Sequence, residues 1–500
     1  MRTFMFLAFS IFVVAVLTTI AILVFRPIGV QIEPAERVPL AAVVTVTSRE
    51  PTSVSLTHHG RHHNEVVASN EGALASTHSV DLLGLYPDSR NELTVRAETA
   101  DGKVHERRLT VETAPLPDYF PTVEIERHAP DLIAPGMTFM ILGHYDDEGT
   151  YHPIPSAVDE YGDVRWFYDG DVGHVLRPLA NGNLLISEDD TLVEIDRLGR
   201  DTGRSWELPN GFHHDAEILP DGNVLALSAA PGSFDDGLVE IDTEGGELVR
   251  EWDFREILDP DRPRQPVNLE EADWLHLNAV EYEPRTGEII VSGRDQSAVV
   301  SIDRQTGALQ WILGSHDHWR EPFRAFLLEP VGTPFAWQWG QHAPMVHPTV
   351  PGRILVYDNG NKRSYDEPLL PTQNYSRAVE YEIDRETMTV RQLWEYGREY
   401  GSELYTPFIG DADYLPNGNR LVTFGGITRT LDGEASELFD YELEAVRRMK
   451  ISARVVEVSS DTPAREIMTI VLRDQDPDSY RGYRVYRSMR MPLYPPPTAE

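Results

Sequence analysis

The sequence predicts an all-β protein: an N-terminal transmembrane helix, a small immunoglobulin- or fibronectin III-like β-sandwich, and a six-bladed β-propeller. Three observations support this prediction. Residues 3–25 carry no charge, short alternating strands follow over 35–115, and a degenerate repeat occupies most of the remaining chain. We therefore expect an anchor at 3–25, a sandwich at 35–115, a propeller at 116–490 and a tail at 491–500.

The N-terminal run reads TFMFLAFSIFVVAVLTTIAILVF. At about 1.5 Å per residue it can cross a bilayer core of roughly 30 Å. It is longer than a typical signal-peptide core and no clear cleavage site follows, so we favour an uncleaved anchor over a cleaved signal peptide. No second span follows. We therefore expect residues 27–500 outside the cytoplasm, in the periplasm or at the cell surface.

Composition excludes several classes of protein. The chain has 81 acidic and 44 basic side chains, a net charge of −37. Nucleic-acid binders need a basic face, so this acidic chain is not expected to bind nucleic acid. The 500 residues contain no cysteine, which excludes disulfides, thiolate metal sites and cysteine nucleophiles.

Residues 35–115 alternate polar and apolar positions in short runs such as AAVVTVTS, SVSLTHHG and ELTVRAET. Turn residues separate these runs, a pattern typical of a small β-sandwich. The Pro-rich stretch APLPDYFPT at 114–122 then marks a domain boundary.

The repeat that follows has two half-motifs. One is a tight turn between strands, as in PLANGNLLIS, LPDGNVLALS and LPNGNRLVTFG. The other is a strand that ends in an acidic residue, as in LVEIDRLG, LVEIDTEG and VVSIDRQTG. Six copies of the second half-motif, most of them followed by an apolar strand, predict six four-stranded blades.

Counting back from the turn glycines locates the inner strand of each blade. Positions eight to ten residues before these glycines are His174, His214, Asn278, His342 and Gly410. Only 17 of the 500 residues are histidine. The enrichment therefore predicts a polar site at one mouth of the propeller channel.

Counting forward from the same glycines adds Arg294 and Asn359 to this region. His276 lies two residues before Asn278, so on an extended strand both side chains would point to the same side. His213, beside His214, is expected to face away from the axis, although the choice between these two histidines stays open. The alternative, purely structural interpretation is that some of these groups line the channel and form hydrogen bonds to one another and to water.

These residue types suit transfer of a small anionic group. A neutral imidazole is a good nucleophile near neutral pH and can form a covalent intermediate. Fixed Arg and Asn donors stabilise negative charge that builds up in the transition state, and a second His can move a proton. This scheme needs neither metal nor cofactor. The chain also has no GxxxxGK loop for the phosphates of a nucleotide donor.

Three segments carry a family resemblance: GFHHDAEILPDGN, the run DWLHLNAVEYEPRTGEIIVSGRDQSAVVSIDRQTGALQWILG, and QHAPM with ILVYDNGNKRS. They resemble the bacterial arylsulfate sulfotransferases, which use phenolic sulfate esters as donors. The resemblance covers about 90–490 and implies a six-bladed propeller behind an N-terminal β-sandwich. It also implies an enzyme that needs no nucleotide sulfate donor.

The resemblance implies a ping-pong transfer from an aryl sulfate to a phenolic acceptor through a sulfohistidine. His342, in the QHA motif, would be the nucleophile. His276, Asn278 and Arg294 would bind the sulfuryl oxygens. His214 would exchange protons with the phenols, alone or with His276. We add Asn359 and His174 as further substrate-binding candidates from the register of the blades.

Two other functions fit parts of the pattern. A lactonase-like propeller hydrolase would hold Ca²⁺ on the axis, and the possible oxygen ligands are Asn278, Asn359, Asp189 and Asp358. The inner ring is predicted to be rich in His and poor in carboxylates, which argues against this hydrolase. A non-catalytic binding or scaffold module outside the cytoplasm is the other alternative.

Overall fold

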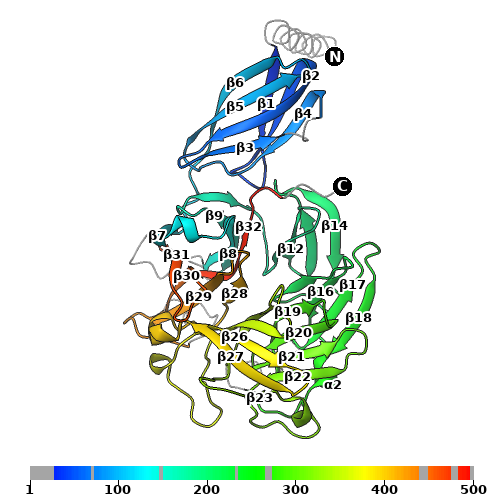
Figure 1. The fold of residues 1–500 in the computed structure, drawn as a ribbon, viewed down its shortest axis with the longest axis vertical. Coiled ribbons are helices and arrows are strands. Elements are labelled where there is room, and N and C mark those ends of the chain that lie inside the picture. Colours follow the sequence, from blue (N-terminus) through cyan, green and yellow to red (C-terminus); the bar gives the residue numbers. More distant parts are fainter. Residues whose placement is uncertain are drawn as a thin grey trace, which may run out of the picture. The chain divides into compact units, whose positions relative to one another are not determined.

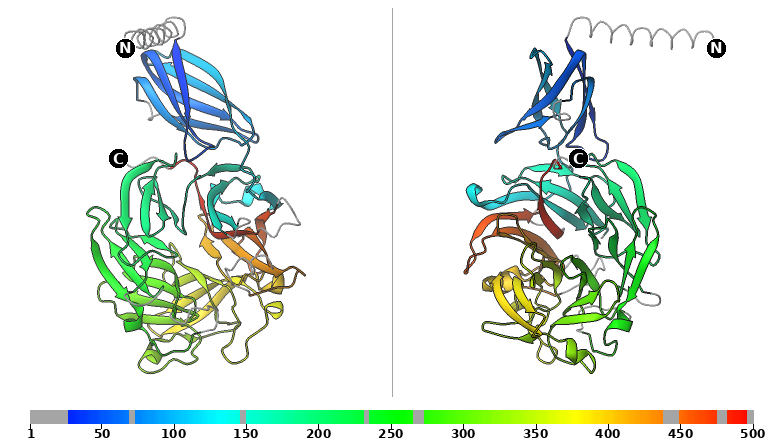
Figure 2. Two further views of the ribbon diagram at one scale, coloured as in Figure 1. Left: turned by 180° about the vertical axis from the view of Figure 1, so that it is seen from behind. Right: turned by 45° about the vertical axis from the view of Figure 1, so that its right-hand side comes forward.

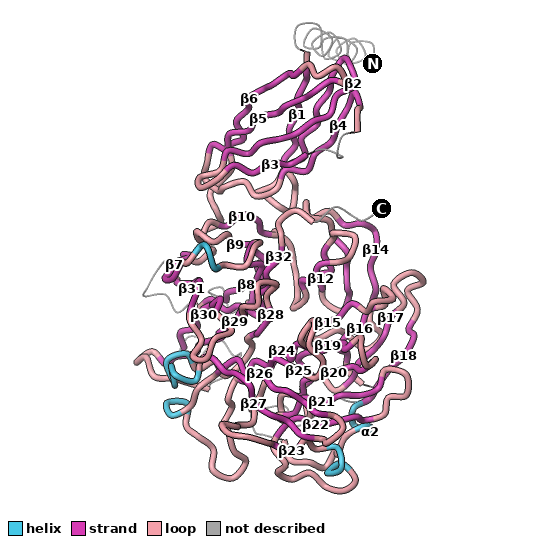
Figure 3. The backbone as a smooth tube through the Cα atoms, in the orientation of Figure 1, coloured by secondary structure: helices cyan, strands magenta, loops and turns pink. Residues whose placement is uncertain are grey.

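The computed structural model describes residues 27–68, 73–145, 150–230, 235–264, 273–437, 449–474 and 482–495. Strands predominate in these ranges, and the few helices are short (Figure 3). The chain divides into two compact units. The first comprises residues 1–118 with the short pieces 164–169 and 198–200, and the second comprises the rest. Each unit is described by itself.

The first unit contains a six-stranded β-structure organised around one long strand (Figure 1). Its strands are β1 (Ile28–Pro34), β2 (Ala42–His59), β3 (Asn64–Ala68), β4 (Ala75–Leu82), β5 (Arg90–Thr99) and β6 (Val104–Glu112). The first half of β2 pairs with β1 and β4, and its second half pairs with β3 and β5. Alternate residues of β2 and β5 are buried, including Val44, Leu56 and Val95. This arrangement agrees with the predicted immunoglobulin-like sandwich.

Among the described residues, the remaining strands form six sheets of four or five strands. In hydrogen-bonded order, the first three are β10 (Val164–Phe167), β9 (Tyr151–Val158), β8 (Met137–Tyr145) and β32 (Tyr483–Met491); β11 (Leu176–Pro178), β12 (Leu184–Glu188), β13 (Thr191–Ile195) and β14 (Asp201–Glu207); and β15 (Ala216–Ile218), β16 (Val224–Ser228), β17 (Gly237–Ile241) and β18 (Leu248–Asp253).

The other three sheets follow in chain order. They are β19 (Leu277–Glu283), β20 (Glu288–Gly293), β21 (Ala298–Asp303) and β22 (Leu309–Gly314); β24 (His342–Val346), β25 (Arg353–Asp358), β26 (Arg377–Asp384), β27 (Thr389–Tyr396) and β23 (Glu329–Pro330); and β28 (Asp411–Tyr414), β29 (Arg420–Thr430), β30 (Met449–Val458), β31 (Glu466–Arg473) and β7 (Thr122–His128). The short helices are α2 (Phe254–Ile257), η1 (Pro130–Leu132), η2 (Phe323–Phe326), η3 (Pro371–Gln373) and η4 (Arg398–Leu404).

In the second unit, one strand from near each end of the chain joins a sheet that is built mainly from the other end. The early strand β7 pairs with β31 of the last sheet, and the late strand β32 pairs with β8 of the first sheet. Strand β32 also contacts β29 and β30, and the first and last sheets lie side by side in both views of Figure 2. The series of sheets is therefore joined end to end by its own termini.

A recurring hydrogen bond explains why the two half-motifs occur together. The turns end in Gly-Asn, and Gly182 and Gly222 both have φ of +90°, a conformation that glycine tolerates best. The asparagine after the glycine donates its side-chain amide to the glutamate of the next strand motif. Three sheets make this bond: Asn183 to Glu194 at 2.5 Å, Asn223 to Glu240 at 2.7 Å, and Asn419 to Glu457 at 2.7 Å.

Apolar side chains fill the space between neighbouring sheets. One cluster joins Leu225 and Leu238 of one sheet to Leu277 and Val291 of the next, with Trp252 packed among them. All five are nearly or completely buried. Trp252, which lies in the fourth strand of its sheet, therefore belongs to the core between the two sheets.

The predicted anchor at 3–25 lies outside the described residues. Within the ranges that the structure covers, no helix is both long enough and apolar enough to cross a membrane.

Candidate functional site

The inner edges of the sheets surround one cavity in the second unit. The strands at these edges are β11, β15, β19, β24, β28 and β32. Five of these strands, together with Asp215 directly before β15, line a cavity of about 290 Å³. The predicted histidines lie at the beginnings of four of these strands: His174 and His214 two residues before β11 and β15, His276 immediately before β19, and His342 at the start of β24.

Three of the predicted histidines form a continuous group of rings. The centroid of His214 lies 5.6 Å from that of His174, in a stacked arrangement, and 4.7 Å from that of His276, edge to face. The ring of Tyr486 lies 4.4 Å from His174. Burial, followed by the charges of Arg484 and Arg487, lowers the pKa of His174 to about 3. His174 is therefore neutral at physiological pH.

His342 is held in one tautomer by Asn359. The Nδ1 atom of His342 lies 2.7 Å from Oδ1 of Asn359. The amide nitrogen of Asn359 donates to the carbonyl oxygens of Thr406 and Ile409, each at 2.8 Å. These two bonds fix the orientation of the carboxamide, so its oxygen must accept from His342 Nδ1. The lone pair of His342 is therefore on Nε2.

The electrostatic environment keeps His342 neutral. Burial, followed by the charge of Arg294, lowers its pKa well below the usual value. A neutral imidazole with a free Nε2 lone pair is the reactive form of a histidine nucleophile.

His276 is held by carboxylates that the sequence analysis did not identify. Its Nδ1 atom lies 2.5 Å from Oδ2 of Asp273 and 3.4 Å from Oδ2 of Asp235. Burial lowers the pKa of His276, but the hydrogen bond to Asp273 and the negative charges of Asp273 and Asp295 together outweigh burial and raise the pKa. His276 and His214 therefore differ, because burial and the neighbouring histidines lower the pKa of His214 well below its usual value.

Asp235 also lies near His213 and His214. The Nδ1 atoms of these two histidines are 3.1 Å apart, and Oδ2 of Asp235 is 3.9 Å from Nδ1 of His214. His213 therefore joins the cluster rather than facing away from it. Potential metal-ligand atoms of His213, His214 and Asp235 lie within 4.8 Å of one another, as do those of Asp235, Asp273 and His276.

Backbone strain coincides with this group. His214 and His276 have φ of +57° and +52°, and Ala343, directly after His342, has φ of +47°. Each non-glycine residue in this region costs on the order of 1–3 kcal/mol, and such residues concentrate at functional sites. The left-handed backbone also corrects one expectation from the sequence. His276 and Asn278 were expected to point to the same side of an extended strand, but His276 lies before β19 and is not extended. The spacing of two residues therefore does not predict the direction of its side chain.

Asn278 is turned away from His276. Its amide nitrogen donates to the carbonyl oxygen of Gln341 at 2.9 Å, and its side chain is completely buried. The register of β19 against β20 shifts between Leu277 and Ala279, and this bulge re-aims the side chain. Asn278 thus contacts the residue immediately before His342.

Arg294 is tied to the His276 segment by the backbone. Its amide N–H donates to the carbonyl oxygen of His276 at 3.1 Å, and the amide of Asp295 donates to that of Leu275 at 3.1 Å. Its side chain is 7% exposed and donates to Asp295 at 3.2 Å. Burial raises the pKa of Asp295 to about 6, although Arg294 opposes this shift. The two backbone hydrogen bonds therefore bring Arg294 and His276, both predicted site residues, close together.

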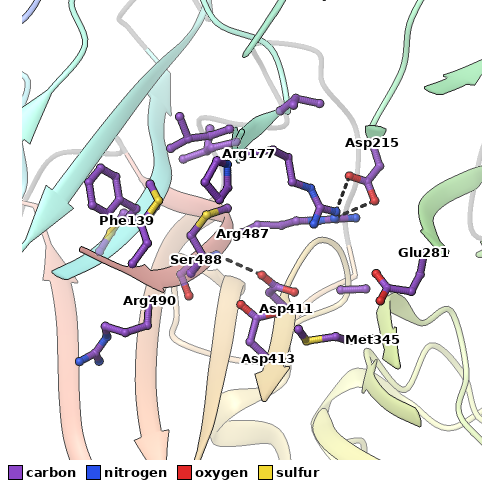
Figure 4. A pocket seen from close by; sticks show the side chains of 18 of the residues that line it. Phe139, Arg177, Asp215, Glu281, Met345, Asp411, Asp413, Arg487, Ser488 and Arg490 are labelled. Atoms are coloured by element: carbon purple, nitrogen blue, oxygen red, sulfur yellow. Dashed lines mark hydrogen bonds and ion pairs between the residues drawn. The ribbon is translucent and has the colours of Figure 1, made fainter. Parts of the chain in front are cut away.

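The channel beyond the histidines is rich in carboxylates, which corrects the prediction of a carboxylate-poor inner ring. Asp215 accepts from two guanidinium groups, that of Arg177 at 3.0 Å and that of Arg487 at 2.8 Å (Figure 4). Glu281 and Asp413 line the same cavity. Burial, together with repulsion from neighbouring carboxylates, raises the pKa of both well above the usual values.

Two of the four oxygen ligands considered for Ca²⁺ are engaged with protein partners. Asp358 accepts from Arg363 at 3.0 Å and from Arg377 at 2.8 Å, and the oxygen of Asn359 accepts from His342. Asn278 donates its amide nitrogen to the backbone of Gln341, and its side-chain oxygen has no hydrogen-bond partner among the described residues. With Asp358 and Asn359 committed, the set of oxygen ligands considered for a hard cation is incomplete.

Three residues near the site, Asp235, Asp273 and Arg487, were not predicted from the sequence, because no motif or spacing singles them out. Asp273 lies three residues before His276, and Asp235 lies in the turn FDDG. Neither belongs to a half-motif of the repeat, so counting from the turn glycines could not reach them. Arg487 lies in the last strand, which completes the first sheet and has no place in the repeat.

Comparisons with known proteins agree with this arrangement. The arylsulfotransferase (ASST) family matches residues 102–484, and the arylsulfotransferase Ig-like domain matches residues 29–114. Two curated relatives are arylsulfate sulfotransferases AssT. The one from Escherichia coli O6:H1 (strain CFT073) is 27% identical, and the one from Lelliottia amnigena is 24% identical; each match covers 84% of this chain and 89% of the relative.

Among solved structures, the periplasmic gluconolactonase PpgL of Pseudomonas aeruginosa has a TM-score of 0.35 and 12% identity, over 83% of this chain and 96% of that one. The family match spans more than half of the chain and includes every predicted site residue. The chain therefore belongs to the arylsulfotransferase family.

Proposed function

We propose that the protein moves a sulfuryl group from an aryl sulfate ester to a phenolic acceptor in two steps, through a sulfohistidine at His342. In the first step, Nε2 of His342 forms a bond to sulfur. The bond from sulfur to the aryl oxygen breaks, and its electron pair leaves with the phenolate. In the second step, an acceptor phenol oxygen attacks sulfur, and the electron pair of the S–N bond returns to Nε2.

The observation that carries this proposal is the bond between His342 and Asn359. It places the proton on Nδ1 and the lone pair on Nε2, and burial beside Arg294 favours the uncharged ring. Asn359, which we predicted to bind substrate, has its three amide hydrogen-bonding partners within the protein. Its role in the proposal is therefore to position the nucleophile.

Proton exchange with the phenols is assigned to His276 and His214. The departing phenolate takes a proton from this pair, and the incoming phenol returns one. The 2.5 Å bond from His276 Nδ1 to Asp273 orients its ring, and the 4.7 Å edge-to-face contact couples it to His214. His174 stacks on His214 and forms part of the wall that substrate meets.

Arg294 is assigned to the sulfuryl oxygens. Its fixed charge acts on both His276 and His342, as expected for a guanidinium between the nucleophile and the proton carrier. A preorganised cation stabilises negative charge that grows on the sulfuryl group. Asn278 supports this part of the site by bonding to the carbonyl immediately before His342.

The wider organisation is part of the same proposal. We place the catalytic six-bladed propeller at 116–490 after the sandwich at 35–115, with the tail at 491–500. The uncharged run at 3–25 supports a membrane anchor and a catalytic part outside the cytoplasm. The partners are small aryl sulfates and phenols, with no nucleic acid.

The experiment uses the purified full-length chain and its His342→Asn variant. Both receive 4-nitrophenyl sulfate with and without phenol, in the presence of a chelator and without nucleotide. The proposal expects phenol-dependent release of nitrophenol by the wild type only. Equal turnover by the variant, or no turnover by the wild type with a panel of aryl sulfates, would overturn it.

A further inference from the structure

Five side chains next to the proposed nucleophile form a compact group of nitrogen and oxygen ligands, which we call the His–Asp cluster: His213, His214, Asp235, Asp273 and His276. Asp235 lies at its centre. Its Oδ2 atom is 3.4 Å from Nδ1 of His276 and 3.9 Å from Nδ1 of His214, and its Oδ1 atom is 3.8 Å from Nε2 of His213.

These separations resemble the edges of a tetrahedral coordination shell. Zinc bonds to His nitrogen and carboxylate oxygen are about 2.0–2.2 Å, so ligand atoms around one tetrahedral ion lie roughly 3.4 Å apart. The Nδ1 atoms of His213 and His214 are 3.1 Å apart, and Asp235 Oδ2 to His276 Nδ1 is 3.4 Å. The ligand atoms form two groups that share Asp235, namely His213 with His214 and Asp273 with His276.

Backbone bonds hold the cluster together before any ion arrives. The amide of Leu277 donates to the carbonyl of Asp235 at 2.7 Å, and the amide of Leu275 donates to the carboxylate of Asp236 at 3.0 Å. The amide of His213 donates to the carbonyl of Leu227 at 3.2 Å. The segments that carry the ligands are thus fixed to one another by the sheet edges from which they emerge.

We propose that the His–Asp cluster binds one zinc-class divalent cation, and that this cation inhibits sulfuryl transfer. Imidazole nitrogens with a carboxylate suit zinc and its transition-metal neighbours, whereas Ca²⁺ and Mg²⁺ prefer an all-oxygen shell. The net charge of −37 raises the local concentration of cations at the protein surface. The His–Asp cluster shares no residue with the set of oxygen ligands considered above for Ca²⁺, which was Asn278, Asn359, Asp189 and Asp358.

Inhibition follows from the atoms that the cation would occupy. It would bind Nδ1 of His214, which faces Asp235, and Nδ1 of His276, where it would displace the proton that this ring donates to Asp273. Both rings would then be fixed by the metal and unable to exchange protons freely with phenols. The inhibitory effect rests on the proposed function, but binding of the cation does not.

Binding is tested on the purified full-length chain with Co²⁺ as a spectroscopic probe and Zn²⁺ in calorimetry. We expect one cation per cluster and the visible absorption of tetrahedral Co²⁺. Loss of a group that supports a metal ligand typically lowers affinity about 10- to 100-fold, so Asp235→Asn should weaken binding at least that much. His213→Gln, an independent variant, should also weaken it. His128→Gln is the matched control, because it breaks a His–carboxylate pair of 3.1 Å between His128 and Glu160 outside the cluster.

The His342→Asn variant separates this inference from the proposed function. It should bind Co²⁺ as the wild type does, even though it transfers no sulfuryl group. Zn²⁺ should slow transfer by the wild type, and Asp235→Asn should need correspondingly more Zn²⁺ for the same effect. The inference is overturned if the wild type binds no Co²⁺, if folded Asp235→Asn and His213→Gln bind it equally well, or if an occupied cluster leaves transfer unchanged. An inactive wild type that still binds the cation would overturn the proposed function alone.

Discussion

The Nδ1 atom of His342 lies 2.7 Å from the side-chain oxygen of Asn359, and both residues are buried. Because the Asn359 amide also holds two backbone carbonyls, it cannot rotate to offer a donor instead. A carboxamide thereby does what a carboxylate often does for a catalytic histidine, without adding a charge. The ring keeps its direction and its tautomer while remaining neutral, as its proposed role as nucleophile requires.

Replacing Asn359 with Leu removes this control. We expect kcat/KM for 4-nitrophenyl sulfate to fall about 10- to 100-fold, because one buried hydrogen bond is worth roughly 1–3 kcal/mol. A positioning role also predicts a slower single-turnover burst with little change in substrate affinity. Asn359→Asp, which preserves the acceptor oxygen, should retain more of the burst rate. A loss confined to KM would indicate that Asn359 binds substrate directly.

The proton-transfer role of His276 predicts a dependence on the leaving group. In His276→Gln, the rate with unsubstituted phenyl sulfate should fall about 100-fold, the lower end of general acid–base contributions. The rate with 4-nitrophenyl sulfate should fall less, since nitrophenolate leaves without needing a proton. Measuring kcat/KM over a series of substituted phenyl sulfates tests this. A uniform loss across the series would assign His276 to sulfuryl binding instead.

The repeated Asn–Glu bond predicts a stability effect away from the site. Asn223 donates to Glu240, which is 2% exposed. Asn223→Ala should lower the free energy of unfolding by about 1.5–3 kcal/mol, the range for hydrogen bonds to charged groups. Urea unfolding of both single variants and the double variant with Glu240→Gln measures the coupling. Strict additivity of the two single effects would show that the bond does not link the half-motifs energetically.

Two buried carboxyl groups that line the cavity, Glu281 and Asp413, predict how the stability of the protein varies with pH. The pKa values of Glu281 and Asp413 are raised well above the ordinary values of 4.5 and 3.8. A carboxyl group whose pKa is raised by folding is stabilising below its unfolded pKa, and that contribution is lost as pH rises through the folded pKa. The loss therefore begins near the ordinary carboxyl pKa values of the unfolded chain and continues upward to the raised values of the folded protein.

Glu281→Gln combined with Asp413→Asn removes this titration. The variant should unfold at a higher temperature than the wild type at about pH 8, and the difference should shrink as pH falls toward about 5. Thermal unfolding of both proteins across this range measures the difference. Glu160→Gln is a surface control, since the Glu160 side chain is 28% exposed and does not line the cavity. A difference between variant and wild type that stays constant with pH would contradict the account.

The repeat and its turns explain how much of the site the sequence could predict. Because tight turns have a fixed length, counting from Gly222 and Gly352 reached His214 and His342 at the starts of their strands. Asn359 and Arg294 follow the second strands of their sheets for the same reason. Local regularity was therefore enough to bring His342, the proposed nucleophile, together with its neighbours; its role came from the family resemblance.

Features outside the repeat could not be found in this way. The bulge after Leu277 turns Asn278 toward Gln341, and the left-handed backbone of His276 changes the direction of its ring. Asp235 and Asp273 lie in connecting segments whose lengths follow no period. Their positions depend on how neighbouring sheet edges pack, which is a property of the folded unit and not of any one motif.

The most direct test of the central claim looks for the covalent intermediate. The full-length chain is mixed with 4-nitrophenyl sulfate without acceptor, quenched in alkali and digested for mass spectrometry. The account predicts a burst of nitrophenolate stoichiometric with the enzyme, a sulfuryl group on the peptide that contains His342, and loss of that group when phenol is added. A sulfuryl group on another residue, or phenol-dependent transfer with no burst and no modified peptide, would contradict it.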